Sequence, residues 1–228
     1  MPSRRPALGA LVLALAGHST AAPPAACTPQ PVREVEEIFL SADCERCWQQ
    51  GDAAAAAPRT LRLDWIVPGR QGDEAPLAAA ALPEAGARLK GQLTADTGSV
   101  QRQRLPAAPS GTRLSVQSGL AWNGYIGLSF ELERVGALPA GARGWVALVE
   151  RVAAGDDGTP VARQLVRTLV GPLPLQPPRG QRRLQHLQAV LLPPNSRAER
   201  LAAVGWVERA DGRMLLAAQS PAAGCAPP

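Results

Sequence analysis

Two cysteines separated by two residues, Cys44 and Cys47, are the pair with the clearest chemical potential in the sequence. They follow closely after the apolar run Ile38-Phe39-Leu40. In such an arrangement a strand delivers the first thiol to the start of a helix, where the helix dipole favours the thiolate, and the second thiol resolves a mixed disulfide. The pattern therefore predicts thiol–disulfide exchange, with Cys44 as the nucleophile and Cys47 as its resolving partner.

The same pair has two other interpretations. It can be a tight structural disulfide, or it can hold a soft metal such as Cu(I) through two thiolates. A closed zinc site is not assembled, because the chain after residue 21 holds only His186 and no second Cys-x-x-Cys. We therefore expect no metal and no cofactor.

Residues 1–21 have the features of a cleaved signal peptide. Arg4-Arg5 provide a basic start, residues 7–16 a short apolar stretch, and Ser19-Thr20-Ala21 a small-residue cleavage site. The apolar stretch is too short to span a bilayer as a stable helix. We expect an exported, periplasmic protein without a stable membrane span, and four cysteines suit that oxidising compartment.

The other two cysteines lie near the ends of the exported chain. Cys27 sits in a Pro- and Ala-rich leader, residues 22–33, and Cys225 in a similar tail, residues 221–228. Four cysteines allow three pairings, and a Cys27–Cys225 bridge leaves Cys44 and Cys47 to each other. Because the ends of a domain are often close together, we predict a structural disulfide between Cys27 and Cys225. Lipid anchoring at Cys27 is not expected.

The charge pattern argues against binding to nucleic acid. The formal net charge is +5, and it falls to about +3 when Arg4 and Arg5 leave with the signal peptide. The arginines are dispersed, with the densest run at Arg179-Gly-Gln-Arg182-Arg183, whereas a nucleic-acid interface needs a clustered basic face with aromatic residues. The expected partner is an unidentified envelope protein or thiol protein.

The N-terminal half alternates between strand and helix signals. Apolar or alternating runs at residues 35–40 and 61–67 predict strands, and Ala-rich stretches at 44–57 and 75–92 predict helices, the second interrupted by Pro83 and Gly86. The polar stretch 94–111 is the best candidate for a domain boundary.

Beyond residue 111 the sequence changes to short alternating runs separated by turn residues. Asp156-Asp157-Gly158 and Ala210-Asp211-Gly212 have the composition of hairpin turns. The predicted strands cover residues 113–117, 123–133, 144–152, 161–170, 184–192, 201–208 and 213–219. The sequence thus predicts an α+β protein with a shortened thioredoxin-like part, residues 34–105, and an antiparallel β-sandwich-like part, residues 110–220.

Three segments resemble a known family. They are the strand and Cys-x-x-Cys ending at Cys47, the second strand with Asp64 beside Trp65, and a β-rich C-terminal part with an Arg-bearing strand at Arg163 and Arg167. The chain in these features is similar to a secreted bacterial thioredoxin-like family of unknown function. That resemblance implies a thioredoxin-like fold, and a cis-proline loop packed against the disulfide, for which Pro106 and Pro109 are the candidates.

Several other residues have a functional and a structural interpretation. Asp64 is either a buried acid that tunes the thiol pair or a solvent-facing strand residue. His186 fits an ordinary strand position better than a catalytic base. Trp122, Trp145 and Trp206 fit core packing, with an exposed ligand platform as the alternative.

Two functions follow from these observations. The first is an exported thiol–disulfide exchange protein acting through Cys44 and Cys47. The alternative is a non-catalytic envelope binding or assembly module, in which both disulfides are structural. The sequence leaves open whether the protein is an enzyme. A buried Cys44–Cys47 pair together with an exposed apolar patch near the β-part tryptophans would favour the module.

Overall fold

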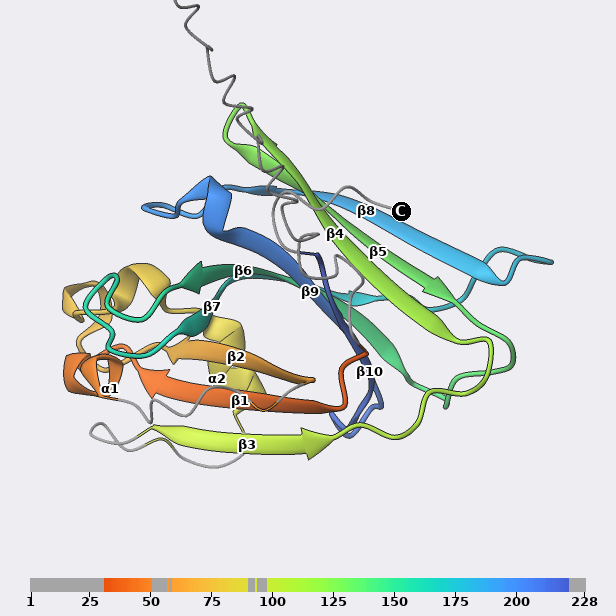
Figure 1. Ribbon diagram of the computed structural model, residues 1–228, viewed down its shortest axis with the longest axis horizontal. Coiled ribbons are helices and arrows are strands. Elements are labelled where there is room, and N and C mark those ends of the chain that lie inside the picture. The colour runs from red at the N-terminus through yellow and green to blue at the C-terminus, as the bar shows by residue number, and fades with distance from the viewer. Residues whose placement is uncertain (1–30, 51–56, 58, 90–92, 94–97, 222–228) are drawn as a thin grey trace, which may run out of the picture.

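The protein is built from two β-sheets (Figure 1) in the computed structural model, which describes residues 31–50, 57, 59–89, 93 and 98–221. The large sheet has the strand order β10-β9-β6-β7-β2-β1-β3, and the small sheet has the order β4-β5-β8. The strands are β1 (Glu34–Ser41), β2 (Thr60–Val67), β3 (Ser99–Arg104), β4 (Arg113–Trp122), β5 (Tyr125–Glu133), β6 (Arg143–Val152), β7 (Arg163–Leu173), β8 (Arg183–Leu191), β9 (Leu201–Glu208) and β10 (Met214–Gln219). Two short α-helices, α1 (Glu45–Gln49) and α2 (Pro83–Arg88), and three 3-10 turns, η1 (Gly72–Glu74), η2 (Ala78–Ala80) and η3 (Ala198–Arg200), complete the described elements.

The predicted α+β, thioredoxin-like fold is wrong, because the described chain is an all-β fold with two small helices. Within the described part of residues 44–57, α1 accounts for five residues. The stretch 75–92 contains one 3-10 turn, η2, and α2 then covers six residues with Pro83 in its first turn. Proline lacks the N–H that a helix interior needs and is tolerated only at a helix start, so Pro83 begins a short helix instead of continuing a long one.

The predicted strands agree with the structure better than the predicted helices do. β1 and β2 are parallel neighbours, in register from Glu34 opposite Thr60 to Ser41 opposite Val67. The later runs form antiparallel strands, and Asp157, Gly158 and Gly212 have the positive φ angles of turn residues. One strand was missed: β3 lies in the polar stretch 94–111 and pairs with β1. Its alternately half-buried polar residues suit a sheet edge rather than a core strand.

The large sheet joins the two parts of the chain that the sequence separated. β7 pairs along β6 and also meets β2, with Asp64 opposite Leu165 in a parallel bridge. Strands from residues 34–105 and from residues 110–220 are therefore hydrogen-bonded side by side in one sheet. The stretch 94–111 contains β3 at the edge of this sheet, and the chain after β3 leads to β4 of the small sheet.

Three clusters of buried side chains hold the layers together. The small sheet lies over β6, β9 and β10 (Figure 1), and apolar residues of both sheets fill the space between them. Gly205 of β9 permits this close approach, because a Cβ there would lie 2.4 Å from Val116 of β4. The opposite face of the large sheet holds a second cluster under α2, with Trp65 and Trp206 fully buried. The third cluster surrounds α1 and the Cys-x-x-Cys pair.

Candidate functional site

The two cysteines predicted to carry the chemistry are bonded to each other and buried. Cys44 and Cys47 form a disulfide, and only 5% of Cys44 and 9% of Cys47 is exposed. Cys44 occupies the N-cap of α1, where its Sγ accepts a hydrogen bond of 3.2 Å from the backbone N–H of Cys47. The five residues of α1 provide little helix dipole. The pair is thus an interior disulfide and not an exposed thiol at the start of a long helix.

Apolar side chains enclose this disulfide. Its cluster contains Ile38, Leu40, Ala42, Trp48, Ile66, Ala75, Val152 and Leu165. The two candidates for a facing cis-proline, Pro106 and Pro109, are exposed residues beyond β3. Within the described chain the cis peptide bond is Gly171–Pro172, at the opposite end of β7 from Arg163. The expected proline loop is therefore not formed by the residues predicted for it.

Arg163 at the start of β7 fixes α1 against the sheet. Its Nη2 donates to the carbonyl oxygens of Cys47, Trp48 and Gln50, at 3.3, 2.9 and 3.0 Å. The guanidinium also lies 4.7 Å from the centre of the Trp48 ring, a favourable cation–π distance. These bonds satisfy carbonyl groups that the end of a short helix leaves without intrahelical partners. The sequence places Arg163 on a strand, but its contact with Cys47 and Trp48 depends on the fold.

Asp64 is the ionic partner of Arg163. Its Oδ1 accepts a 3.0 Å bond from Arg163 Nη1, and its Oδ2 accepts a 2.8 Å bond from the backbone N–H of Gln164. Burial raises the pKa of Asp64 above its ordinary value, against the opposing effects of Arg163, Gln164 and Arg62. Burial likewise lowers the pKa of Arg163, although Asp64 opposes that shift. Asp64 is therefore buried, as one interpretation expected, but it orders Arg163 instead of facing a thiol.

This raised pKa predicts a distinctive pH dependence of stability. Because the folded protein holds the Asp64 proton at a pH where the unfolded chain has lost it, the stability that this proton contributes is present below about pH 4 and is lost as pH rises through the folded pKa. Asp64→Asn removes this contribution to the pH dependence of the free energy of unfolding. We expect urea unfolding midpoints of the variant, measured across about pH 4–7, to fall less with rising pH than those of the wild type. Parallel curves would show that Asp64 does not titrate in this range.

A second buried ionic cluster lies on the opposite face of the large sheet. Arg88 of α2 binds Glu37 of β1 and, at 3.0 Å, Glu208 of β9. Its guanidinium also lies 4.7 Å from the centre of the Trp206 ring. Burial lowers the pKa of Arg88, but the attraction of Glu37 and Glu208 outweighs it and leaves that pKa raised.

Three indole N–H groups complete the same cluster. Trp65 donates to Glu37, and Trp145 and Trp206 both donate to Glu208, at distances of 2.8–3.2 Å. Each carboxylate therefore accepts bonds from both the arginine and tryptophan side chains. A cluster in which buried charges and donors are mutually satisfied is a structural cross-link between strands and α2.

The remaining predicted residues do not form a reactive set. His186 bonds the carbonyl oxygen of Pro174 through Nε2 at 2.8 Å and packs beside Phe130, as a strand residue would. Within the described residues there is no group of three metal-ligating side chains. In the same part of the chain, no helix has the length and apolar character to cross a membrane. Cys27 and Cys225 lie outside the described residues, so their pairing stays a prediction that peptide mapping of the non-reduced protein can test.

The tryptophans of the β part divide between core and surface. Trp206 is fully buried and Trp145 is half-buried, whereas Trp122, at the end of β4, is 82% exposed. The turn Asn123-Gly124 joins Trp122 directly to Tyr125 of β5, and Leu191 of β8 lies opposite Tyr125. Together with the 93% exposed Leu120, these side chains form an apolar tip, made of Leu120, Trp122, Tyr125 and Leu191. Asn-Gly between alternating runs is the sequence signal for this turn, although the predicted strand 123–133 includes both residues.

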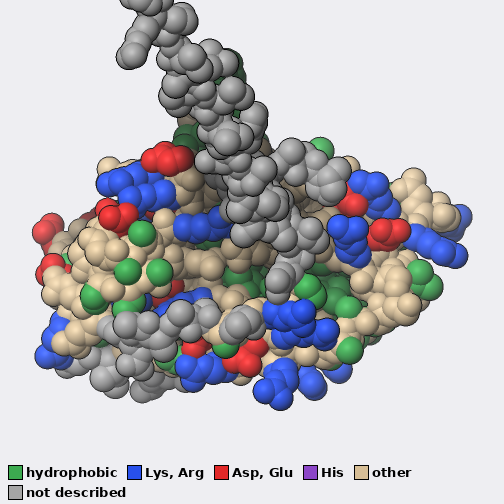
Figure 2. Space-filling model, in the orientation of Figure 1, with side chains coloured by type: hydrophobic (Ala, Val, Ile, Leu, Met, Phe, Trp, Pro, Cys, Tyr) green, Lys and Arg blue, Asp and Glu red, His purple; other side chains and the backbone are tan. Residues whose placement is uncertain are grey.

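The other end of the small sheet is charged. Arg113, Glu133 and Arg183 lie opposite one another across the three strands, and Arg183 also pairs with Glu131. Figure 2 shows basic and acidic side chains together at the side of the molecule where β8 begins.

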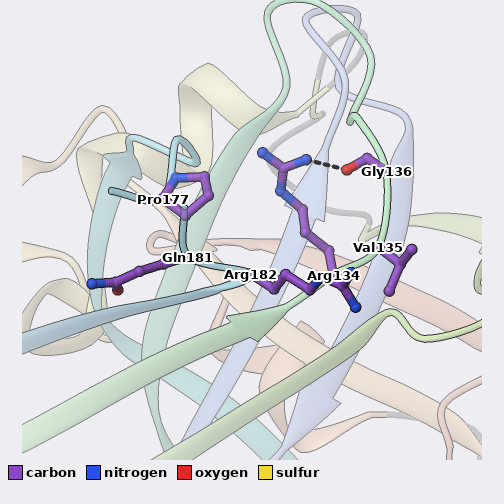
Figure 3. Close-up of a pocket in the computed structure, with 6 residues that line it drawn as sticks. All are labelled: Arg134, Val135, Gly136, Pro177, Gln181 and Arg182. Atoms are coloured by element: carbon purple, nitrogen blue, oxygen red, sulfur yellow. Dashed lines mark hydrogen bonds between the residues drawn. The ribbon is translucent and has the colours of Figure 1, made fainter. Parts of the chain in front are cut away.

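A shallow pocket of about 260 Å³ adjoins the charged end (Figure 3). The residues that line it are Arg134, Val135, Gly136, Pro177, Gln181 and Arg182. The Arg134 guanidinium is directed at the carbonyl oxygen of Gly136. The lining contains no carboxylate, histidine, hydroxyl or thiol side chain, so the pocket offers no acid–base or nucleophilic chemistry.

Comparison with known proteins identifies a structural neighbour. The chain is similar to HBP35 of Porphyromonas gingivalis, with a TM-score of 0.54 and 12% sequence identity, over 86% of this chain and 77% of that one. The likeness is one of fold. No protein-family model and no curated protein matches the sequence. The all-β arrangement thus has a counterpart among solved structures, while the function must be argued from the residues themselves.

Proposed function

We propose that the protein is an exported, non-catalytic binding or assembly module of the cell envelope. In this proposal the Cys44–Cys47 disulfide is structural, and the apolar tip of the small sheet is the contact surface. The observation that carries the proposal is the contrast between the two places: the disulfide is enclosed, whereas the largest apolar side chains of the tip are open to solvent.

The environment of the disulfide argues against exchange as its main role. Exchange begins when an external thiolate attacks a sulfur along the S–S axis, which requires access to at least one of the two sulfurs. Cys44 and Cys47 are both nearly inaccessible, and Arg163 holds the backbone of Cys47 in place. A disulfide in such surroundings stabilises the turn between β1 and α1.

The exposed side chains at the tip are of the kinds that proteins use for contact. Tryptophan and tyrosine combine a large apolar surface with a polar group and are enriched in interaction sites. Trp122 is 82% and Leu191 is 65% exposed, with Tyr125 and Leu120 adjacent in the same hairpin. The largest contiguous apolar patch on a protein surface is often a functional one.

Export is part of the proposal and rests on the sequence. Arg4-Arg5, the apolar residues 7–16 and the small residues before position 22 form the pattern of a cleaved signal. A buried disulfide between Cys44 and Cys47 is also suited to an oxidising compartment such as the periplasm. The proposed partner is accordingly a component of the envelope.

Reduction of the purified protein tests the role of the disulfide. We expect a reduction potential below about −300 mV, the range of structural disulfides, and slow reduction by dithiothreitol in the absence of denaturant. Titration against glutathione and dithiothreitol buffers, followed by thiol trapping and mass spectrometry, measures the potential. A potential near that of a redox enzyme, with rapid reduction of the folded protein, would instead favour thiol–disulfide exchange.

Site-specific cross-linking tests the contact surface. A photo-reactive amino acid placed at position 122 of the full chain is expected to cross-link to an envelope component in cells. The same amino acid at position 185, which is exposed on the same sheet near its charged end, is the matched control. Equal cross-linking from both positions, or none from position 122, would contradict a contact surface at the tip.

A further inference from the structure

We infer that the apolar tip docks on the surface of a lipid bilayer, with the hairpin entering end-on. The inference deepens the proposed function and rests on it, because it names the envelope component that the tip contacts. The β4–β5 hairpin projects beyond the rest of the small sheet in Figure 1.

Charge is graded along the length of the small sheet. Residues 114–130, which include most of β4 and β5 and the turn between them, contain no Asp, Glu, Lys or Arg, and neither do residues 184–196 around β8. The charged side chains Arg113, Glu133 and Arg183 all lie at the end of the sheet away from the tip. The gradient therefore matches the change in polarity from water to the interior of a bilayer. A structure with this gradient can place its uncharged end in the membrane interface while its charged end stays in water.

The side chains and the backbone of the tip suit the same environment. Tryptophan and tyrosine concentrate at the level of lipid headgroups, where their rings are partly apolar and their N–H and O–H groups remain hydrated. Trp122 and Tyr125 occupy opposite positions at the hairpin end, with the aliphatic Leu120 and Leu191 beside them.

Strand pairing in this hairpin resumes after a bulge between Ser118 and Ala121 and continues to the Trp122–Tyr125 pair at its end. Asn123 and Gly124 have the positive φ angles, 51° and 79°, of a tight two-residue turn. The carbonyl oxygen of Gly124 accepts a 2.9 Å bond from the backbone N–H of Leu192. Paired backbone groups lower the cost of bringing the tip into an apolar medium.

The size of the tip argues against a second copy of the chain as the occupant. Four partly exposed side chains offer on the order of 500 Å² of surface, since a large aromatic residue buries about 150–250 Å². A stable protein interface needs about 800 Å² from each partner. A protein partner that lay flat on the exposed face of the small sheet would also contact Leu187, which is 73% exposed near the middle of β8. Leu187 therefore distinguishes docking on the sheet face from insertion of the tip.

Vesicle binding followed through Trp122 tests the inference directly. The other tryptophans of the chain are buried or half-buried, so Trp122 dominates any response of exposed indole to its surroundings. With vesicles of phosphatidylcholine, or of phosphatidylethanolamine and phosphatidylglycerol, we expect a blue shift of tryptophan emission and quenching by phosphatidylcholine brominated in its acyl chains. The shift and quenching should be lost in Trp122→Phe. A difference between the two vesicle types reports a contribution from anionic headgroups.

Matched variants separate insertion of the tip from docking on the sheet face. Leu120→Asp and Leu191→Asp are each expected to lower the partition into vesicles, measured by co-sedimentation, by about tenfold or more. Leu187→Asp, at a similarly exposed position of the same sheet, should change the partition by less than about threefold. Leu187 lies four residues from Leu191 along β8, which is about 13 Å from the tip. All three positions are solvent-exposed, so the variants should fold.

Three results would overturn the inference: no blue shift or quenching with either vesicle, an equal loss in Leu187→Asp, or a blue shift that follows protein dimerisation without lipid. If vesicles are not bound while position 122 still cross-links to an envelope protein in cells, the lipid inference fails and the proposed function stands. If the tip neither binds vesicles nor cross-links, both fail.

Discussion

Replacing Arg163 by methionine is expected to destabilise the protein by about 3–5 kcal/mol, the range found when one partner of a buried ion pair is removed. The side chain of Arg163 is 2% exposed and that of Asp64 is 0% exposed. The variant leaves the carboxyl of Asp64 with only Arg62, whose Nε lies 3.8 Å from Oδ1, and it removes the donor to the carbonyl groups at the end of α1. Urea unfolding followed by circular dichroism measures the change.

Two comparisons show whether the loss comes from the ion pair. Arg163→Met combined with Asp64→Asn removes both charges of the pair, so we expect the double variant to recover part of the lost stability. Arg197→Met removes a cation that is 55% exposed and 3.8 Å from Asp157, and should cost at most about 1 kcal/mol. An Arg163→Met protein as stable as Arg197→Met would show that the contacts of Arg163 with α1 contribute little.

The same variant connects stability with the chemistry of the cysteines. Arg163 holds the carbonyl oxygens of Cys47 and Trp48, so its removal should let α1 open more often. Dithiothreitol should then reduce the Cys44–Cys47 disulfide faster in Arg163→Met than in the wild type under native conditions. Unchanged reduction kinetics would mean that the sulfurs are protected by the apolar cluster alone.

The sequence was sufficient for strands whose burial follows from local alternation. The strand predicted at residues 201–208 is β9, over the same residues, and the strands predicted at 35–40 and 61–67 are β1 and β2. β3 was missed because its residues are mostly polar, and its place in the sheet depends on pairing with a distant strand. Local patterns carry no information about such a partner.

The fold class could not be obtained from the Cys-x-x-Cys signature. A strand followed by this motif is shared by thioredoxin-like proteins and by any turn that needs a short disulfide, and the difference lies in the elements that follow. Here the position beside β2 is taken by β7, a strand about 100 residues later, which brings Asp64 opposite Leu165. Such long-range placement is set by burial and by the Asp64–Arg163 pair, neither of which is visible in local periodicity.

The candidate site was predicted in its residues but not in its surroundings. Cys44 and Cys47 were identified by spacing alone, whereas their burial depends on side chains from β1, β2, β6 and β7. For the contact surface, most of the residues themselves could not be identified from the sequence. Trp122 was noted, but Leu120 and Leu191 gain meaning only when the Asn123-Gly124 turn and the register with β8 place them at one end of the small sheet.

Replacing Arg88 by methionine is expected to cost about 3–5 kcal/mol of stability. Arg88 is the cation that pairs with two buried carboxylates, Glu37 and Glu208, and without it both would lose this counter-charge. Like charges in a buried position raise the energy of the folded state, and the loss of the guanidinium also removes its hydrogen bonds and its packing on the indole ring. Urea unfolding at neutral pH measures the effect.

Replacing the two carboxylates by amides distinguishes charge repulsion from lost packing as the cause of this loss. In Arg88→Met combined with Glu37→Gln and Glu208→Gln, the amide oxygens can still accept bonds from the three indole N–H groups, but no charge is left, so stability should recover in part. Arg102→Met, which removes a cation that is 64% exposed beside Glu36, is the surface control and should cost at most about 1 kcal/mol. If the triple variant is no more stable than Arg88→Met, charge repulsion between Glu37 and Glu208 is not the cause, and the packing of Arg88 between α2 and the tryptophans carries the stabilisation instead.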